Sequence, residues 1–372
     1  MNERVGVFGG TFDPVHTGHL LLAEAARAQA GLSRVLFMPA HIQPFKQDAG
    51  ISPDDDRLRM LSLAISDNPG FGVTLIEIEQ GGVSYTIDSL RALRSSLGGM
   101  RLCFIIGTDM FLMIGKWKEA DALVREFDFA VGVRPGYLHG EAVAKAEALK
   151  QSHGTRVDFV DNPPIRLSST ELRECVKNGG TIRYLVPESV RRYLLVRERE
   201  GERRFAHTKR VVDLASEMAK RFGADAEKAA LAALLHDYCK DSGGGAENDV
   251  AHGAMAADAA RREFGVTDED VLNAIRYHTT GRAGMSRLEL IVFLADTVEP
   301  GRTYDRIARL RDTCRDDLEK GALDVLIELK LYLEKKGLAV SEDTEAAIED
   351  LRHRCRKEVT IQAIASPPSF RA

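Results

Sequence analysis

Two histidines, His16 and His19, follow a glycine-rich turn near the start of the sequence. The turn, over residues 9–12, comes after an apolar run at 5–8 and precedes a helical pattern that begins near Leu20. A strand, a turn and a helix N-terminus together present unpaired N–H groups and the positive end of the helix dipole. Imidazoles spaced three residues apart lie on one side of such a helix. This arrangement predicts a site that stabilises the charge of a polyphosphate during transfer.

A second set of residues able to do chemistry lies in the other half of the sequence and combines imidazoles with carboxylates. Its members are His207, His236, Asp237, His252, His278 and Asp296. Neutral imidazole plus carboxylate is a ligand set for iron, manganese, cobalt or zinc rather than for calcium or magnesium. Six ligands exceed what one tetrahedral site needs, so we expect two transition-metal ions, with Asp237 between them.

The elements that position the first two histidines follow from sequence periodicity. Short apolar runs alternate with amphipathic helical stretches over residues 4–160, which predicts a parallel β-sheet with helices on both faces. We expect strands over 4–8, 34–38, 73–78, 101–106, 128–133 and 156–160, and helices over 19–30, 56–66, 86–97, 116–125 and 139–151. Such sheets bind ligands at the carboxyl ends of their strands. Functional residues should therefore follow the strands directly.

Several candidate binding residues do follow predicted strands. They are Lys46 after the second strand, Thr86 after the third, Gly107 and Asp109 after the fourth, Arg134 after the fifth, and Ser169, Thr170 and Arg173 after the sixth. The last three begin a helix, so its N-terminus suits the outer phosphates of a nucleotide. Trp117, the only tryptophan, offers a face for stacking on a flat ring.

The strand pattern disappears beyond Gly201, where we place the domain boundary. Helices are predicted over 204–222, 225–239, 247–264, 268–278, 286–298, 303–319, 322–336 and 342–357. We therefore expect a Rossmann-like α/β domain over residues 1–200, an all-α domain over 201–357 and a disordered tail over 358–372.

Composition limits the choice of partners and compartment. The 372 residues carry a net charge of −5, which favours neither a nucleic acid nor an anionic membrane as a partner. The five cysteines show no C-x-x-C spacing, as is typical of reduced thiols. Because we find neither a long apolar run nor a signal-peptide pattern, we expect a cytoplasmic protein. Its oligomeric state is left open, with a homo-oligomer as one alternative.

The first half also resembles a known family. The stretches G-G-T-F-D-P-V-H-T-G-H and S-S-T-E-L-R resemble the nucleotidyltransferase superfamily. When the stretches S-Y-T-I-D-S-L and K-W-K are added to these, residues 4–197 are similar to bacterial nicotinate-nucleotide adenylyltransferases. The resemblance implies transfer of an adenylyl group from ATP, accompanied by Mg²⁺, to nicotinate mononucleotide, giving deamido-NAD and diphosphate. A superfamily enzyme acting on phosphopantetheine or nicotinamide mononucleotide is the alternative.

The resemblance also assigns roles to individual residues. It implies that ATP lies over Gly9, Gly10, Thr11, Phe12, His16 and His19, with Ser169, Thr170 and Arg173 at its β- and γ-phosphates. Thr86 and Trp117 would lie against the nicotinate ring, and Lys46, Gly107, Asp109 and Arg134 complete the nucleotide-binding set. The family commonly shows P-P-H-K where this chain has Gln43-Pro44-Phe45-Lys46, so the lysine is retained and the histidine is replaced.

The second half resembles the HD superfamily of metal-dependent phosphohydrolases. The segments A-H-T-K-R-V, L-L-H-D-Y-C-K-D, A-H-G-A, Y-H-T-T-G and F-L-A-D-T-V-E-P-G-R are similar to bacterial HD enzymes that hydrolyse diadenosine tetraphosphate symmetrically to two ADP. The resemblance implies that the six residues above bind two metals, iron being favoured over manganese and cobalt. Lys240, Thr279, Thr280, Arg282 and Arg302 are candidates for binding phosphate oxygens. The alternatives are a non-catalytic, nucleotide-sensing domain and a different phosphate substrate.

Overall fold

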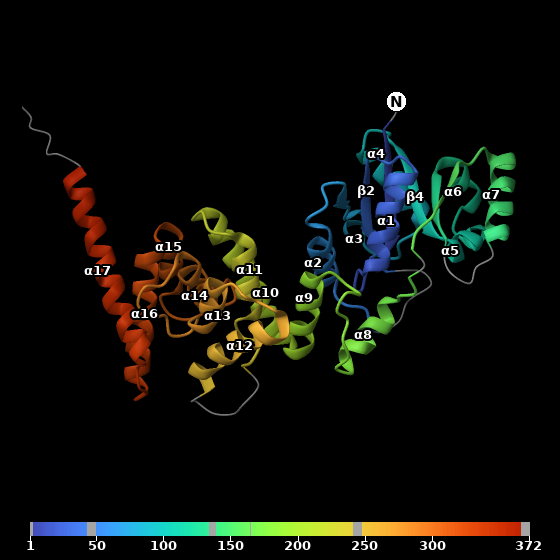
Figure 1. Ribbon diagram of the computed structural model, residues 1–372. Helices are drawn as coiled ribbons and strands as arrows, with labels where there is room; N and C mark the ends of the chain where they lie inside the picture. Colours follow the sequence, from blue (N-terminus) through green and yellow to red (C-terminus); the bar gives the residue numbers. More distant parts are fainter. Residues whose placement is uncertain (1–2, 43–49, 134–138, 164, 241–247, 366–372) are drawn as a thin grey trace, which may run out of the picture. The chain divides into compact units, whose positions relative to one another are not determined.

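The computed structural model describes residues 3–42, 50–133, 139–163, 165–240 and 248–365 (Figure 1). The chain divides into two compact units, residues 1–194 and 195–372. The division falls within helix α9 (Glu188–Arg199), a few residues before the boundary predicted at Gly201. No helix among the described residues combines the length and apolar character needed to cross a bilayer.

A six-stranded parallel sheet forms the centre of the first unit, as predicted. Its strands are β1 (Arg4–Gly10), β2 (Arg34–Pro39), β3 (Phe71–Val73), β4 (Arg101–Gly107), β5 (Asp128–Gly132) and β6 (Val157–Val160). They pair in the order β3-β2-β1-β4-β5-β6. The chain winds outward in both directions from β1, so the carboxyl ends of β1 and β4 flank the point where ligands of open parallel sheets bind.

Helices cover this sheet and connect its strands (Figure 1). They are α1 (Thr17–Gln29), α2 (Asp54–Ile65), α3 (Ile76–Gln80), α4 (Thr86–Ser96), α5 (Thr108–Leu112), the 3₁₀ turn η1 (Ile114–Lys116), α6 (Ala120–Glu126), α7 (His139–His153) and α8 (Ser169–Lys177). Strands β1, β4 and β5 are almost continuously buried because helices pack against both faces.

One predicted strand is largely wrong. The sequence predicts a strand over 73–78, but β3 ends at Val73 and residues 76–80 form the short helix α3. Glu77 of this helix is buried, which raises the pKa of its carboxyl, and the hydroxyls of Ser84 and Ser89 offset part of that rise. A local sequence pattern alone cannot reveal an acidic side chain that turns inward to such neighbours.

The second unit is all-helical over its described residues, as predicted. Its helices are α10 (Glu202–Arg221), α11 (Ala226–Leu235), α12 (Asn248–Phe264), α13 (Glu269–Arg276), α14 (Arg287–Val298), α15 (Ile307–Asp316), α16 (Leu318–Lys335) and α17 (Glu342–Ala365). Helix α14 is buried on nearly all sides and packs against α10, α11, α13, α15 and α16. Helix α17 continues beyond the end predicted at residue 357, since no proline interrupts it before Pro367.

Candidate phosphate-transfer site and candidate metal centre

The two histidines after β1 fix each other at the N-terminus of α1. His16 is the N-cap: its Nδ1 accepts from the backbone N–H of His19, and His19 Nδ1 accepts from that of His16, both at 3.3 Å. The rings stack with centroids 3.6 Å apart, and Phe12 packs edge-on against His19. Because both Nδ1 atoms act as acceptors, each neutral ring carries its proton on Nε2. Such an N–H is a donor suited to a phosphate oxygen.

The start of α8 lies against the same loop. Ser168 caps α8, the hydroxyl of Ser169 donates to the carbonyl of Pro14 at 2.9 Å, and Arg173 Nη1 donates to the carbonyl of Asp13 at 2.5 Å. Thr170 occupies the first turn of this helix. Two helix N-termini therefore converge on the turn after β1, which concentrates donors and positive dipole ends there.

A buried arginine that the sequence analysis did not single out supports this loop. Arg57 of α2 is fully buried; its Nη1 donates to the carbonyl of Thr11 at 2.8 Å and its Nε to that of Ser52 at 3.2 Å. Its Nη2 pairs with Asp54. The backbone N–H of Ser52 in turn donates to Asp13 at 2.9 Å. Charge-assisted hydrogen bonds from Arg57 thus fix the backbone of the glycine turn.

The residues expected at the nicotinate ring lie on neighbouring segments. Thr86 begins α4, and Trp117 directly follows η1. Lys118 joins the two segments, because its Nζ lies 2.8 Å from Asp88 and 4.6 Å from the centre of the Tyr85 ring. Trp117 itself is partly buried against the core of the unit.

The remaining predicted residues of the first unit are only partly located. Gly107 ends β4 beside β1, and Asp109 lies in the first turn of α5. Lys46 and Arg134 lie outside the described residues.

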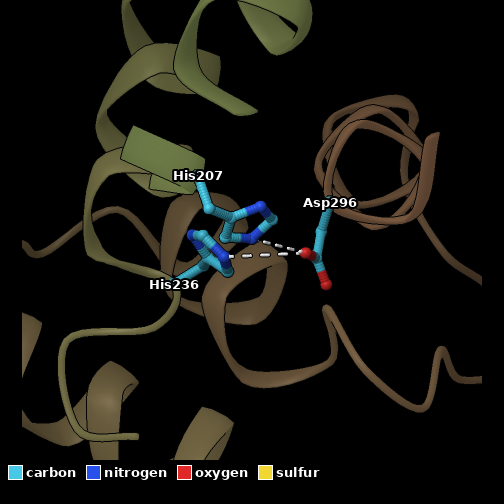
Figure 2. A group of neighbouring side chains, drawn as sticks. All are labelled: His207, His236 and Asp296. Atoms are coloured by element: carbon cyan, nitrogen blue, oxygen red, sulfur yellow. Dashed lines mark ion pairs between the residues drawn. The ribbon is translucent and has the colours of Figure 1, made fainter. Parts of the chain in front are cut away.

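The second unit brings its six predicted histidines and aspartates together. Figure 2 shows His207 of α10 and His236, just after α11, both facing Asp296 of α14. The Nε2 atoms lie 3.0 and 3.9 Å from the same oxygen, Asp296 Oδ1. These three residues form one candidate metal-binding group, with ligand atoms within 4.8 Å of one another.

A second candidate group adjoins the first and shares His236 with it. It contains His236, Asp237 and His278. Asp237 Oδ2 lies 3.7 Å from His236 Nε2, whereas Oδ1 lies 3.5 Å from His278 Nε2 and 3.1 Å from His252 Nε2. The two oxygens of Asp237 thus face different imidazoles.

The helix ends determine which nitrogen two of the imidazoles present. His236 Nδ1 donates to the carbonyl of Ala233 and His278 Nδ1 to that of Ile275, each at 2.7 Å. These carbonyls belong to the last turns of α11 and α13, where the helix provides no N–H partner. The lone pairs on Nε2 therefore face the cluster. His236 Nε2 is buried without a hydrogen-bond partner, which is the condition expected of a nitrogen that binds a metal.

The charges of the cluster also suit a divalent metal. Burial lowers the pKa of His236 to about 4, so its imidazole is neutral at pH 7. Burial raises the pKa of Asp237 and Asp296, but the surrounding histidines more than offset this and hold both pKa values well below the usual range. Neutral imidazoles and ionised carboxylates are the forms that bind metals. The residues present therefore fit a divalent metal.

The candidate phosphate-binding groups differ in their surroundings. Lys240 Nζ lies 3.4 Å from Asp237, and Arg302 Nη2 lies 2.7 Å from Asp296. The buried hydroxyl of Thr279 has no hydrogen-bond partner. Arg282 instead forms a two-pronged pair with Glu289 at 2.6 and 2.7 Å, so its guanidinium is already engaged.

Comparisons with known proteins agree with this division. The cytidylyltransferase-like family matches residues 7–175 and the HD domain matches residues 204–301. A probable nicotinate-nucleotide adenylyltransferase from Moorella thermoacetica is 40% identical over 192 residues, covering 51% of this chain and 88% of the relative. One from Herpetosiphon aurantiacus is 41% identical over 193 residues, covering 52% of this chain and 96% of the relative. A crystal structure described as a predicted HD superfamily hydrolase involved in NAD metabolism, from Clostridium acetobutylicum, is 29% identical, covers 51% of this chain and all of that one, and has a TM-score of 0.39.

The parallel sheet with its histidine-capped loop after β1 defines the first unit as a nucleotidyltransferase domain, and the helical unit with its histidine–aspartate cluster is an HD domain. Through its first half, the chain belongs to the nicotinate-nucleotide adenylyltransferase family.

Proposed function

We propose that the first unit transfers the adenylyl group of ATP to nicotinate mononucleotide, giving deamido-NAD and diphosphate. The observation that carries this proposal is the convergence of α1 and α8 on the loop after β1, where His16 and His19 lie. The similarity to nicotinate-nucleotide adenylyltransferases along nearly the whole length of those proteins supports the choice of acceptor.

The proposed chemistry relies on positioning and charge stabilisation. The phosphate of nicotinate mononucleotide attacks the α-phosphorus of ATP in line, and diphosphate leaves. The Nε2–H groups of His16 and His19 stabilise the charge that develops on the phosphate oxygens, while the start of α8 holds the leaving diphosphate. Mg²⁺ accompanying ATP would neutralise further charge. Thr86 and Trp117 orient the pyridine ring.

We propose that the second unit is a metal-dependent phosphohydrolase that splits diadenosine tetraphosphate into two ADP. Its support is the six-residue cluster, in which His236 presents an unpartnered nitrogen and the two carboxylates are ionised. His207, His236, Asp237, His252, His278 and Asp296 would hold two transition-metal ions, iron being favoured. Such a pair would supply an activated water and stabilise charge on the phosphate oxygens. Lys240 and Arg302 would bind the polyphosphate.

One experiment with the full-length protein tests both proposals. Wild type, His19→Ala and Asp237→Ala are assayed for deamido-NAD formation, with nicotinamide mononucleotide and phosphopantetheine as competing acceptors. The same proteins are assayed for ADP formation from diadenosine tetraphosphate with Fe²⁺, Mn²⁺ or Co²⁺. We expect His19→Ala to lower adenylyl transfer about a hundredfold and to leave hydrolysis intact, the usual effect of removing an oxyanion-stabilising donor.

Asp237→Ala should give the reverse result, with hydrolysis abolished and adenylyl transfer retained. A metal-loaded wild-type protein that leaves diadenosine tetraphosphate intact would refute the second substrate assignment. A preference for another acceptor over nicotinate mononucleotide would refute the first.

A further inference from the structure

Among the imidazoles of the candidate metal centre, His207 obtains its orientation differently from His236 and His278. Those two lie at helix ends and donate to carbonyls of their own last turns. His207 lies inside α10, where each backbone carbonyl already accepts the N–H four residues later. Its Nδ1–H is instead bonded to an acceptor on another element of the fold.

Glu299, at the C-terminal end of α14, provides that acceptor. Its Oε1 lies 3.1 Å from His207 Nδ1, and its side chain is 1% exposed. The opposite ring nitrogen, Nε2, lies 3.0 Å from Asp296 Oδ1. His207 is thus held on both sides, with Glu299 behind the ring and the candidate metal position in front of it.

Glu299 is itself fixed by donors that do not belong to the metal cluster. Arg210 Nε lies 2.5 Å from Oε2 and Arg210 Nη2 lies 3.2 Å from Oε1, while the backbone N–H of Gly301 also donates to Oε2. A Cβ at Gly301 would lie 2.6 Å from Nε and Nη2 of Arg210. The glycine therefore leaves room for the guanidinium that holds Glu299.

We propose that Glu299 is a positioning residue of the metal centre, which keeps the proton of His207 on Nδ1 and aims Nε2 at a metal. A carboxylate behind an imidazole fixes the tautomer and raises the basicity of the ligating nitrogen, and its removal commonly lowers metal affinity by about 10–100-fold. This inference rests on the proposed metal site, but not on the choice of diadenosine tetraphosphate as substrate.

Mn²⁺ binding to the metal-stripped full-length protein tests the proposal. Free Mn²⁺ is measured by electron paramagnetic resonance during titration of wild type, Glu299→Ala, Glu299→Gln and Glu289→Gln. Glu289 is the matched control, because it lies on α14, the helix that Glu299 caps, is 2% exposed and is also paired with an arginine. We expect affinity to fall about 10–100-fold in Glu299→Ala and less in Glu299→Gln, whose carbonyl can still accept the Nδ1–H. Glu289→Gln should bind Mn²⁺ as wild type does.

The tautomer of His207 gives a readout that a purely structural role would not change. Long-range ¹H–¹⁵N spectra of the metal-free protein, at a pH where the imidazole is neutral, should show the proton on Nδ1 to a greater extent in wild type and Glu289→Gln than in Glu299→Ala, where Asp296 is the remaining carboxylate beside the ring. In Glu299→Ala they should show a shift of the proton to Nε2. Wild-type Mn²⁺ affinity in Glu299→Ala, or an unchanged tautomer, would overturn the proposal. If wild type bound no Mn²⁺, the metal site and the inference would both fail, whereas Mn²⁺ binding without hydrolysis would refute only the proposed substrate.

Discussion

Replacing Arg57 with methionine should destabilise the first unit by several kcal/mol. The side chain is fully buried, and its loss leaves the carbonyls of Thr11 and Ser52 and one oxygen of Asp54 without their donor. Each buried acceptor left unpaired costs about 1–3 kcal/mol. Asp54 is partly exposed and keeps His41 as a partner at 2.5 Å. Water and the imidazole therefore offset part of the free-energy cost of removing its arginine partner. The two carbonyls together therefore cost roughly 2–6 kcal/mol, which includes the usual range for breaking a buried pair.

The same substitution should weaken ATP binding. Thr11 belongs to the loop between β1 and α1, so losing its anchor lets the backbone of the proposed phosphate site move. We therefore expect KM for ATP to rise more than kcat falls. Arg57→Lys keeps the positive charge, but its single ammonium group cannot reach all three acceptors at once. Its stability and its KM for ATP should therefore lie between those of wild type and Arg57→Met.

Urea denaturation followed by tryptophan fluorescence measures the free energy of unfolding of the first unit, because Trp117 is the only tryptophan and lies in that unit. Arg27→Met is the control: Arg27 pairs with Glu24 on the surface at 2.6 Å, and removal of such an exposed pair should change stability far less than loss of Arg57. If Arg57→Met lost no more stability than Arg27→Met and kept its KM for ATP, the assigned role of the buried arginine would be wrong.

Three further predictions concern other sites. Burial raises the pKa of Glu200 from 4.5 to about 7, so as pH rises the unfolded chain loses this proton before the folded chain does. The stability of the second unit should therefore fall by about 3 kcal/mol as pH rises from about 4.5 to 7. Urea titrations of the chelator-treated proteins should show this loss in wild type and not in Glu200→Gln. A Cβ at Gly253 would lie 2.5 Å from the carbonyl oxygen of Arg276, so Gly253→Ala should push α12 away from α13 and displace His252. Mn²⁺ binding should weaken by roughly tenfold. An unchanged Mn²⁺ affinity would contradict this packing argument. Trp117→Ala should raise KM for nicotinate mononucleotide more than KM for ATP, since a ring contact is lost while the phosphate loop is untouched; equal changes in steady-state kinetics would argue against stacking.

Much of the fold could be predicted because local patterns and tertiary packing agree. Strands such as β4 are buried on both faces and appear as unbroken apolar runs, and most helices show clear periodicity between glycine, serine or proline breaks. The prediction failed at residues 76–78, where an acidic residue turns inward. Glu77 finds its partners, Ser84 and Ser89, only after the chain has folded back, and no local pattern records such contacts.

The candidate sites show the same limit more sharply. Histidines and aspartates in recognisable motifs could be found, because their types and spacing are themselves the signal. Arg57 and Glu299 could not be assigned roles, since an arginine within a helical pattern, or a glutamate just after one, looks like a solvated surface charge. Each gains its role from acceptors or donors distant in the sequence: Arg57 holds a carbonyl 46 residues away and Glu299 an imidazole 92 residues away. Burying such a charge is costly unless it is fully paired. A buried, fully paired charge next to a candidate site is therefore a structural reason to suspect a positioning role, and one that becomes visible only once the fold is known.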